Sequence, residues 1–232
     1  SPAAVEDWIK NVGKFPVVAK LRTGSGSNNV TLILDEKGLR KYSSKMFAKG
    51  MKSSPNTFFK LKSNLKSTKS FKVFIERFKR IPEYLFSRKS AKSLQKEKGY
   101  VYLQEYIDGV NYDLKIAVVG DRLSFVSRGT RPGEFRASGG GTLFYDKSLM
   151  NNSMIEAAFK AYDALKSDCT GLDMIKDPRT GDPVILEVSY GFSHDAQIKA
   201  KGYFDRNCKW HDTPFNPPRA LLDNLIKEIT LK

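Results

Sequence analysis

The chain has few cysteines and few histidines, with two of each in 232 residues. Cys169 and Cys208 lie far apart, and neither belongs to a CxxC pair. This sparse usage is typical of a reducing compartment, so we predict a cytoplasmic protein. A zinc site that combined Cys208 with His211 would need further ligands.

Long apolar runs are also absent. No stretch of roughly 18 apolar residues occurs, which predicts that the chain has no membrane span. The chain opens at Ser1-Pro2-Ala3-Ala4, without an apolar signal segment or an initiator Met, as expected of a processed, tagged or trimmed chain. With 40% hydrophobic and 28% charged residues, we expect a soluble globular protein of one large domain or one and a half.

Acidic residues are scarce between Arg40 and Lys98, where Lys and Arg recur among serines and aromatic residues. The whole chain has 40 Lys and Arg against 25 Asp and Glu, a net charge of +15. The electrostatic field of such a charge attracts polyanions, including nucleic acid, acidic glycans, polyphosphates and anionic lipid. The charge alone does not indicate which of these is the partner. A basic segment that only keeps the protein soluble explains the same composition. The interleaved aromatics either stack on single-stranded nucleic acid or belong to the core.

The N-terminal part of the chain predicts two strands joined by a turn rich in glycine and serine. The first strand ends at Lys20, and the segment Thr23–Asn29 follows it. Such a turn offers backbone N–H groups to an anion, and a lysine entering it reaches the same phosphates. The turn lacks the GxxxxGK[ST] pattern and the following helix of a Walker A loop, and such hairpins also occur without a ligand. The expected elements are helix 2–12, strands 15–20 and 30–34, helix 36–50 and loop 51–70.

The C-terminal part predicts an antiparallel sheet with an inserted helix. Strand 100–107 is rich in β-forming residues, and strands 113–119 and 122–128 form a hairpin around Gly120-Asp121. The three arginines Arg128, Arg131 and Arg136 follow closely, an arrangement that suits bidentate clamping of a phosphate or carboxylate. The further expected elements are an amphipathic helix at 151–167 and a proline-led helix at 215–228.

A second hairpin places two acids inside apolar strands. The strands Gly171–Ile175 and Val184–Ser189 flank a turn rich in Gly, Pro and Asp. Asp173 precedes Glu187 by 14 residues, so the hairpin can bring both carboxylates to neighbouring positions on one sheet face. They repel each other unless a cation lies between them, and Mg²⁺ prefers such oxygen ligands. The alternative is that both acids point into solvent.

The order of these motifs resembles the ATP-grasp superfamily. It runs from the lysine-ended strand through Gln104–Ile107, an Asp-x-Lys strand and Arg131–Arg136 to Gly-x-Asp and Leu-Glu-Val-Ser. Within the superfamily, the segments 104–107 and 131–136 are most similar to the ligases that add glutamate to a ribosomal-protein C-terminus. The resemblance covers residues 15–191 and implies an α+β fold of two lobes whose antiparallel sheets enclose ATP. Residues 1–98 would form the lobe with the phosphate loop and a basic insertion, and residues 99–232 the lobe with the metal site.

The resemblance also implies roles for individual residues in binding ATP, in catalysis and in holding Mg²⁺. Phosphoryl transfer is mainly positioning and charge neutralisation, which these residue types supply. The nucleotide-binding residues would be Lys20 on the α and β phosphates, Gly24, Ser25, Gly26 and Ser27 in the loop that closes over them, Glu105, Tyr106 and Ile107 at the adenine hinge, Asp113 at the ribose, and Ser138. The catalytic residues would be Arg136, on the terminal phosphate and the developing acyl-phosphate charge, with Arg128 and Lys115, and the magnesium ligands would be Asp173, Glu187 and Ser189.

Three features depart from the family pattern. Lys115 stands where that branch has Arg, which keeps the charge but loses the guanidinium fork. Ser189 replaces the metal-binding Asn, and Ser138 replaces another Asn; a hydroxyl is a poorer Mg²⁺ ligand than an amide carbonyl. About 14 residues precede the lysine strand, where family members carry an N-terminal domain. Either the chain is a fragment, or something else binds the acceptor.

The resemblance implies an ATP- and Mg²⁺-dependent carboxylate–amine ligase that acts through an acyl phosphate. Its partners would be ATP, an amine and an acidic carboxylate substrate, such as a protein tail or an acidic glycan. The segment Tyr203–Asn207 with Trp210-His211 either shapes the acceptor site or packs as an aromatic tail. A kinase of a polyanionic small molecule, such as an inositol phosphate, and an inactive nucleotide-binding module are the alternatives. Nucleic acid is a less favoured partner, and the sequence leaves the oligomeric state open.

Overall fold

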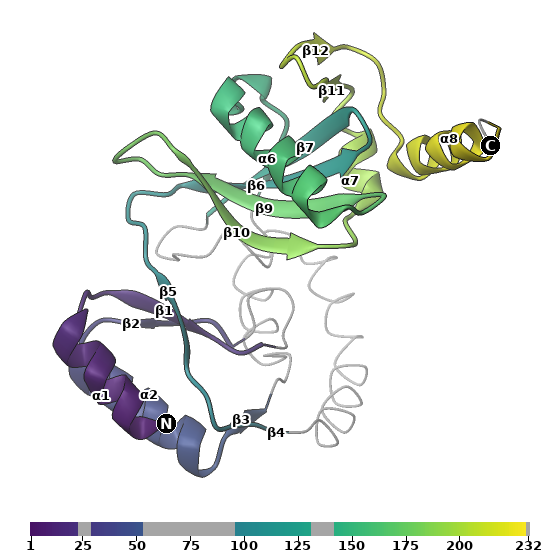
Figure 1. Cartoon of the computed structure of the whole chain (residues 1–232). Coiled ribbons are helices and arrows are strands. Elements are labelled where there is room, and N and C mark those ends of the chain that lie inside the picture. Colours follow the sequence, from purple (N-terminus) through teal and green to yellow (C-terminus); the bar gives the residue numbers. More distant parts are fainter. Residues whose placement is uncertain (23–28, 53–95, 131–141, 231–232) are drawn as a thin grey trace, which may run out of the picture. The chain divides into compact units, whose positions relative to one another are not determined.

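The structure of the chain is a computed structural model that describes residues 1–22, 29–52, 96–130 and 142–230 (Figure 1). The chain forms two compact units, Ser1–Tyr106 and Ile107–Lys232. Each unit combines helices with antiparallel sheet, in agreement with the predicted α+β class. The sequence divided the chain after Lys98, whereas in the structure the strand that follows pairs within the first unit.

The first unit is a small antiparallel sheet with two helices. Its three strands have the order β2-β1-β5. Helices α1 and α2 lie side by side, and both contribute buried residues to one core with β1 (Figure 1). The elements are α1 (Pro2–Asn11), β1 (Val17–Lys20), β2 (Thr31–Ile33), α2 (Glu36–Ala48), β3 (Met51–Lys52), β4 (Lys96–Glu97) and β5 (Tyr102–Glu105).

Local sequence explains where both helices of this unit begin. The Ser1 hydroxyl accepts a hydrogen bond from the Ala4 N–H at 3.3 Å, and Asp35 accepts one from the Gly38 N–H at 2.7 Å. Each bond satisfies one of the backbone donors that a helix N-terminus leaves unpaired. Apolar residues at helical spacing then face the sheet, and the buried core includes Val5, Ile9, Val17, Ala19, Leu39 and Met46. The predicted helices and strands of this unit are confirmed, with slightly shorter bounds.

The second unit is built on a larger antiparallel sheet. Its strand order is β10-β9-β6-β7-β11-β12, and β8 pairs with β7. Helix α6 packs across one face of the sheet (Figure 1). The elements are β6 (Tyr112–Val119), β7 (Arg122–Gly129), β8 (Leu143–Phe144), the 3₁₀ helix η1 (Lys147–Leu149), α6 (Asn152–Leu165), β9 (Thr170–Lys176), β10 (Pro183–Ser189), α7 (His194–Ile198), β11 (Tyr203–Phe204), β12 (Trp210–His211) and α8 (Pro217–Thr230). Across the described ranges, no helix has both the length and the apolar character that crossing a membrane requires.

The two faces of this sheet differ in chemistry, because successive side chains of a strand point to opposite faces. On β6, Leu114 and Ile116 pack in one buried cluster with Met154 and Phe159 of α6. Lys115, which lies between the two apolar residues of β6, therefore projects from the other face. One face is the main apolar core of the unit, and the other carries charged side chains.

The aromatic segment near the C-terminus belongs to this apolar core. Phe204 of β11 is 6% exposed, and its ring stacks on Phe125 with centroids 6.3 Å apart. Trp210 of β12 meets Phe204 edge-on at 4.9 Å. The sequence left open whether this segment shapes an acceptor site or packs as an aromatic tail. The structure supports the packed tail.

Candidate functional site

A charged pair lies at the start of the β6–β7 hairpin. Asp113 and Arg128 are directly opposite each other in the strand register. Arg128 donates a hydrogen bond from Nε to Oδ1 of Asp113 at 3.0 Å and a second from Nη2 to Oδ2. The side chains are only 13% and 10% exposed. Burial raises the pKa of Asp113, and the Arg128 guanidinium opposes this by stabilising the carboxylate.

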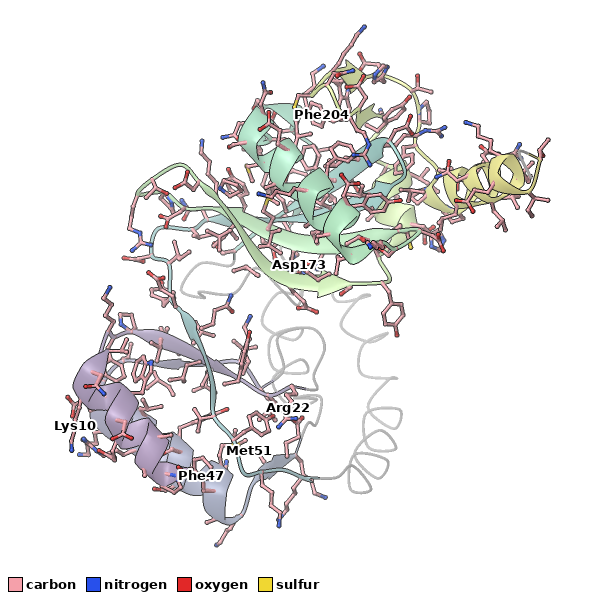
Figure 2. All side chains as sticks on the ribbon, viewed as in Figure 1. Lys10, Arg22, Phe47, Met51, Asp173 and Phe204 are labelled. Carbon is pink, nitrogen blue, oxygen red and sulfur yellow. The ribbon has the colours of Figure 1, made fainter. Side chains whose placement is uncertain are left out.

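A second pair follows two residues further along β6. Lys115 lies opposite Asp173 of β9, and its Nζ donates to both carboxylate oxygens, at 2.6 Å to Oδ1 and 2.7 Å to Oδ2. The side chains are 37% and 25% exposed, so solvent reaches the pair. Asp173 is labelled on its strand in Figure 2. An ammonium group thus already contacts one of the two carboxylates that the sequence assigned to Mg²⁺.

Glu187 of β10 lies directly opposite Asp173, which confirms the pairing predicted from the sequence. Glu187 is exposed, and its carboxylate forms no ion pair or hydrogen bond with the part of the chain that the structure describes. Lys115, Asp173 and Glu187 therefore form a row across β6, β9 and β10. We call this row the charged triad. With its lysine protonated and both acids ionised, the triad carries one net negative charge.

A shift in strand register places Glu187 in the triad. Ile185 pairs with Met174, but Glu187, two positions later, pairs with Asp173, so Leu186 is an extra residue in β10. Without the shift, Asp173 would face Leu186, and Glu187 would face Leu172 on the apolar side of the sheet. The bulge therefore moves Glu187 from the core face to the charged face.

Ser189, the third residue assigned to the metal, lies two positions beyond Glu187 and pairs with Gly171. A Cβ atom at Gly171 would stand 3.0 Å from the Gly191 carbonyl oxygen and 3.4 Å from the Phe192 side chain. The glycine thus permits the chain that leaves β10 to pass close to β9. Asp173, Glu187 and Ser189 share one sheet face, because their positions alternate with core-facing residues.

These three side chains offer oxygen donors of the kind that suits Mg²⁺. Within the described ranges, no group of three or more His, Cys, Asp or Glu residues could hold a metal ion by itself. Two carboxylates nevertheless suffice where substrate phosphates and water complete the coordination, which is the usual way that proteins hold Mg²⁺. The donors fit an ion that arrives with a phosphate ligand, and such an ion must compete with Lys115 for Asp173.

The structure adds Gln197, which the sequence analysis did not single out. This residue of α7 is 1% exposed, and its Nε2 donates to the Lys115 carbonyl oxygen at 2.9 Å. Its Oε1 is buried and has no hydrogen-bond partner among the described residues. Gln197 therefore fixes the backbone of β6 at the triad. A single glutamine in a short helix forms no motif, so only the folded structure reveals this contact.

The first unit holds the predicted nucleotide-binding residues Lys20 and Glu105. Lys20 ends β1 opposite Tyr102, and Glu105 ends β5 opposite Val17. The two residues lie at opposite ends of the paired strands, about 10 Å apart at roughly 3.3 Å per residue. Their predicted roles at the phosphates and at adenine stay predictions.

Several predicted site residues lie outside the described residues, and so does most of the basic region after Lys52. Tyr106 ends the first unit, and Ile107 begins the second. The roles of all these residues stay predictions. The site residues outside the described ranges are Gly24, Ser25, Gly26, Ser27, Arg136 and Ser138.

Comparison with known proteins does not assign the chain to a family. A scan against protein-family models finds no match, and a search of curated proteins finds none with significant similarity. The likeness to the ATP-grasp superfamily therefore depends on the motifs and their order alone.

Proposed function

We propose that this protein is an ATP- and Mg²⁺-dependent carboxylate–amine ligase of the ATP-grasp type. The observation that carries the proposal is the charged triad, in which two carboxylates and a lysine lie in one row on a solvent-accessible sheet face. Acids held together beside a cationic side chain are the parts that bind a metal–phosphate complex.

In the proposed reaction, the acceptor carboxylate attacks the terminal phosphate of ATP and ADP leaves. An amine then attacks the acyl phosphate, phosphate leaves, and an amide remains. Mg²⁺ held by Asp173 and Glu187 would neutralise charge on the transferred phosphoryl group. Lys115 supplies positive charge beside these acids. Arg128 is a positioning residue in this scheme, because it holds Asp113 in the orientation proposed for binding the ribose.

The net charge of +15 favours an acidic acceptor, such as a carboxylate-rich protein tail or an acidic glycan. The same charge also suits a kinase of a polyanionic small molecule. The two functions differ in product, because a kinase leaves a stable phosphorylated substrate, whereas a ligase releases phosphate only when carboxylate and amine are both present.

A phosphate-release assay with Mg²⁺-ATP against pools of amino acids, acidic sugars and inositol phosphates tests the proposal. We expect Glu187→Gln to lower turnover by roughly a hundredfold or more, the range that charge-stabilising groups supply. Glu156→Gln is the matched control, because Glu156 is an exposed glutamate on α6. Equal unfolding temperatures for both variants would show that the loss of turnover in Glu187→Gln is not caused by a loss of folding stability. Full activity of Glu187→Gln would contradict the metal assignment.

An inactive nucleotide-binding module is the second candidate, and a specific observation favours it. Lys115 already occupies both oxygens of Asp173, and Ser189 offers a hydroxyl where the resembling ligases have an amide. Both features weaken metal binding. Saturable ATP binding without phosphate release in any substrate pool would select this function over the ligase.

A further inference from the structure

We propose that Lys115 is an internal counter-ion that makes the charged triad select a metal–polyphosphate complex over a free divalent cation. The inference rests on the proposed function, because it takes Asp173 and Glu187 as the metal ligands. It adds a reason why the metal ion and the phosphate chain must bind together.

The charge balance of the triad gives the first step. The triad carries one net negative charge, and a divalent cation would change this to one net positive charge. One anionic phosphate oxygen that ligates the same metal ion neutralises this positive charge locally. If Lys115 were uncharged, two carboxylates and one divalent cation would already be neutral, and the phosphate would bring no such gain.

The surroundings of Lys115 give the second step. A metal ion that takes Asp173 removes the only side-chain anion that Lys115 contacts within the described residues. Asp113, two residues away on the same face, is already bound by Arg128 through two hydrogen bonds. Glu187 would be occupied by the same metal ion. The displaced ammonium therefore needs a new anion, and a phosphate on the metal ion supplies one.

Two opposite effects follow from replacing Lys115 with the uncharged, similarly shaped methionine. Lys115→Met should bind free Mn²⁺ about tenfold more tightly than the wild type, because the competing ammonium is gone. The same variant should bind Mg²⁺–tripolyphosphate about tenfold more weakly, because the phosphate loses its lysine. Changes of this size lie within the usual range of coupled binding.

The test uses the full chain and two binding measurements. Electron paramagnetic resonance of free Mn²⁺ gives the affinity for the metal ion alone, and calorimetric titration gives the affinity for preformed Mg²⁺–tripolyphosphate. Lys176→Met is the matched control, because it removes the same charge from an exposed position on β9 whose side chain points to the face opposite Asp173. We expect this control to change both affinities by less than about twofold.

The outcomes separate this inference from the proposed function. Tighter binding of Mn²⁺ together with weaker binding of Mg²⁺–tripolyphosphate in Lys115→Met supports the counter-ion role. If Lys115→Met binds both ligands more weakly, or binds both with unchanged affinity, the counter-ion role is wrong. Loss of Mn²⁺ binding in Glu187→Gln would still support the metal site in that case. Absence of Mn²⁺ and Mg²⁺–tripolyphosphate binding in every variant would overturn both proposals.

Folding of the variant is checked by a second measurement. Removing Lys115 leaves Asp173 and Glu187 facing each other without a counter-charge, which lowers the stability of the sheet. Mn²⁺ should then raise the unfolding temperature of Lys115→Met more than that of the wild type. An equal or smaller rise would contradict the inference without depending on either affinity.

Discussion

Asp113 and Arg128 face each other across β6 and β7, and two hydrogen bonds join their nearly enclosed side chains. The carboxylate pays a desolvation cost that raises its pKa, and only the guanidinium beside it opposes that rise strongly. The charge state of Asp113 therefore depends mainly on Arg128, with smaller effects of Asp173 and Lys115, and this dependence can be measured.

Arg128→Met should destabilise the protein by about 3–5 kcal/mol near neutral pH, because it leaves a buried carboxylate without its cation. A protonated Asp113 does not need the cation, so the deficit should shrink as the pH falls towards about 4. The pKa of Asp113 is raised in the folded state, so the free energy of unfolding decreases as the pH rises above the pKa of an unfolded Asp. In Arg128→Met this pKa is raised further, so the stability of the variant should decrease more steeply over the same pH range. Urea unfolding of both proteins across this pH range measures the effect.

Arg219→Met is the control for the Arg128 experiment. Arg219 pairs with Asp223 at 2.9 Å on α8, where the arginine is 71% exposed. A surface pair of this kind contributes at most about 1 kcal/mol. A deficit of Arg128→Met that is small, or equal at both ends of the pH range, would contradict the account of Asp113.

Tyr42→Phe should stabilise the first unit by up to about 1 kcal/mol. The Tyr42 hydroxyl is buried and has no hydrogen-bond partner among the described residues, so its removal eliminates a desolvation cost. Burial, aided by the charges of Tyr100 and Glu97, raises the pKa of Tyr42 to about 12. A tyrosine whose pKa is higher in the folded than in the unfolded state lowers the free energy of unfolding as the pH rises between the two values. The Tyr42→Phe variant lacks this group, so it should lose less stability than the wild type in alkali.

Ultraviolet absorbance of tyrosinate and urea unfolding together check the Tyr42 prediction. The variant should lack the tyrosine that titrates near pH 12. Tyr102→Phe is the matched control, because Tyr102 is 50% exposed and its replacement should leave stability nearly unchanged. A Tyr42→Phe protein that is less stable than the wild type would show that the hydroxyl has a partner.

Gly202→Ala should destabilise the second unit by about 3 kcal/mol, the upper part of the range for overpacking. A Cβ atom there would overlap the Trp210 indole and lie 2.5 Å from the His211 carbonyl oxygen, which is backbone and cannot rotate away. Gly191→Ala is the matched control, since a Cβ atom there meets nothing within 4 Å. Thermal unfolding followed by tryptophan fluorescence should separate the two variants, and equal unfolding temperatures would contradict the prediction.

The sequence predicted well those features that depend on local pattern. Strand 113–119 was recognised by alternation and by its Gly-Asp turn, and the terminal helix by its proline start and apolar spacing. Both are present, as β6 and α8. The pairing of Asp173 with Glu187 across the hairpin was also predicted, because a hairpin brings together residues that are near in sequence.

Features that depend on pairing between distant segments were not predicted. The ion pair between Lys115 and Asp173 joins residues 58 positions apart, and its register follows from how β9 docks on β6. No periodicity encodes that choice. The role of Gln197 was missed for the same reason, since its contact with the Lys115 backbone depends on where α7 folds back.

The bulge in β10 accommodates one extra residue while the pairing with β9 is kept on both sides of Leu186. A chain lacking only Leu186 would form one uninterrupted ladder, in which Ile185 still pairs with Met174 and Glu187 still pairs with Asp173. Loss of this single residue would therefore leave the charged triad in place, because the bulge and the extra residue compensate each other in the register.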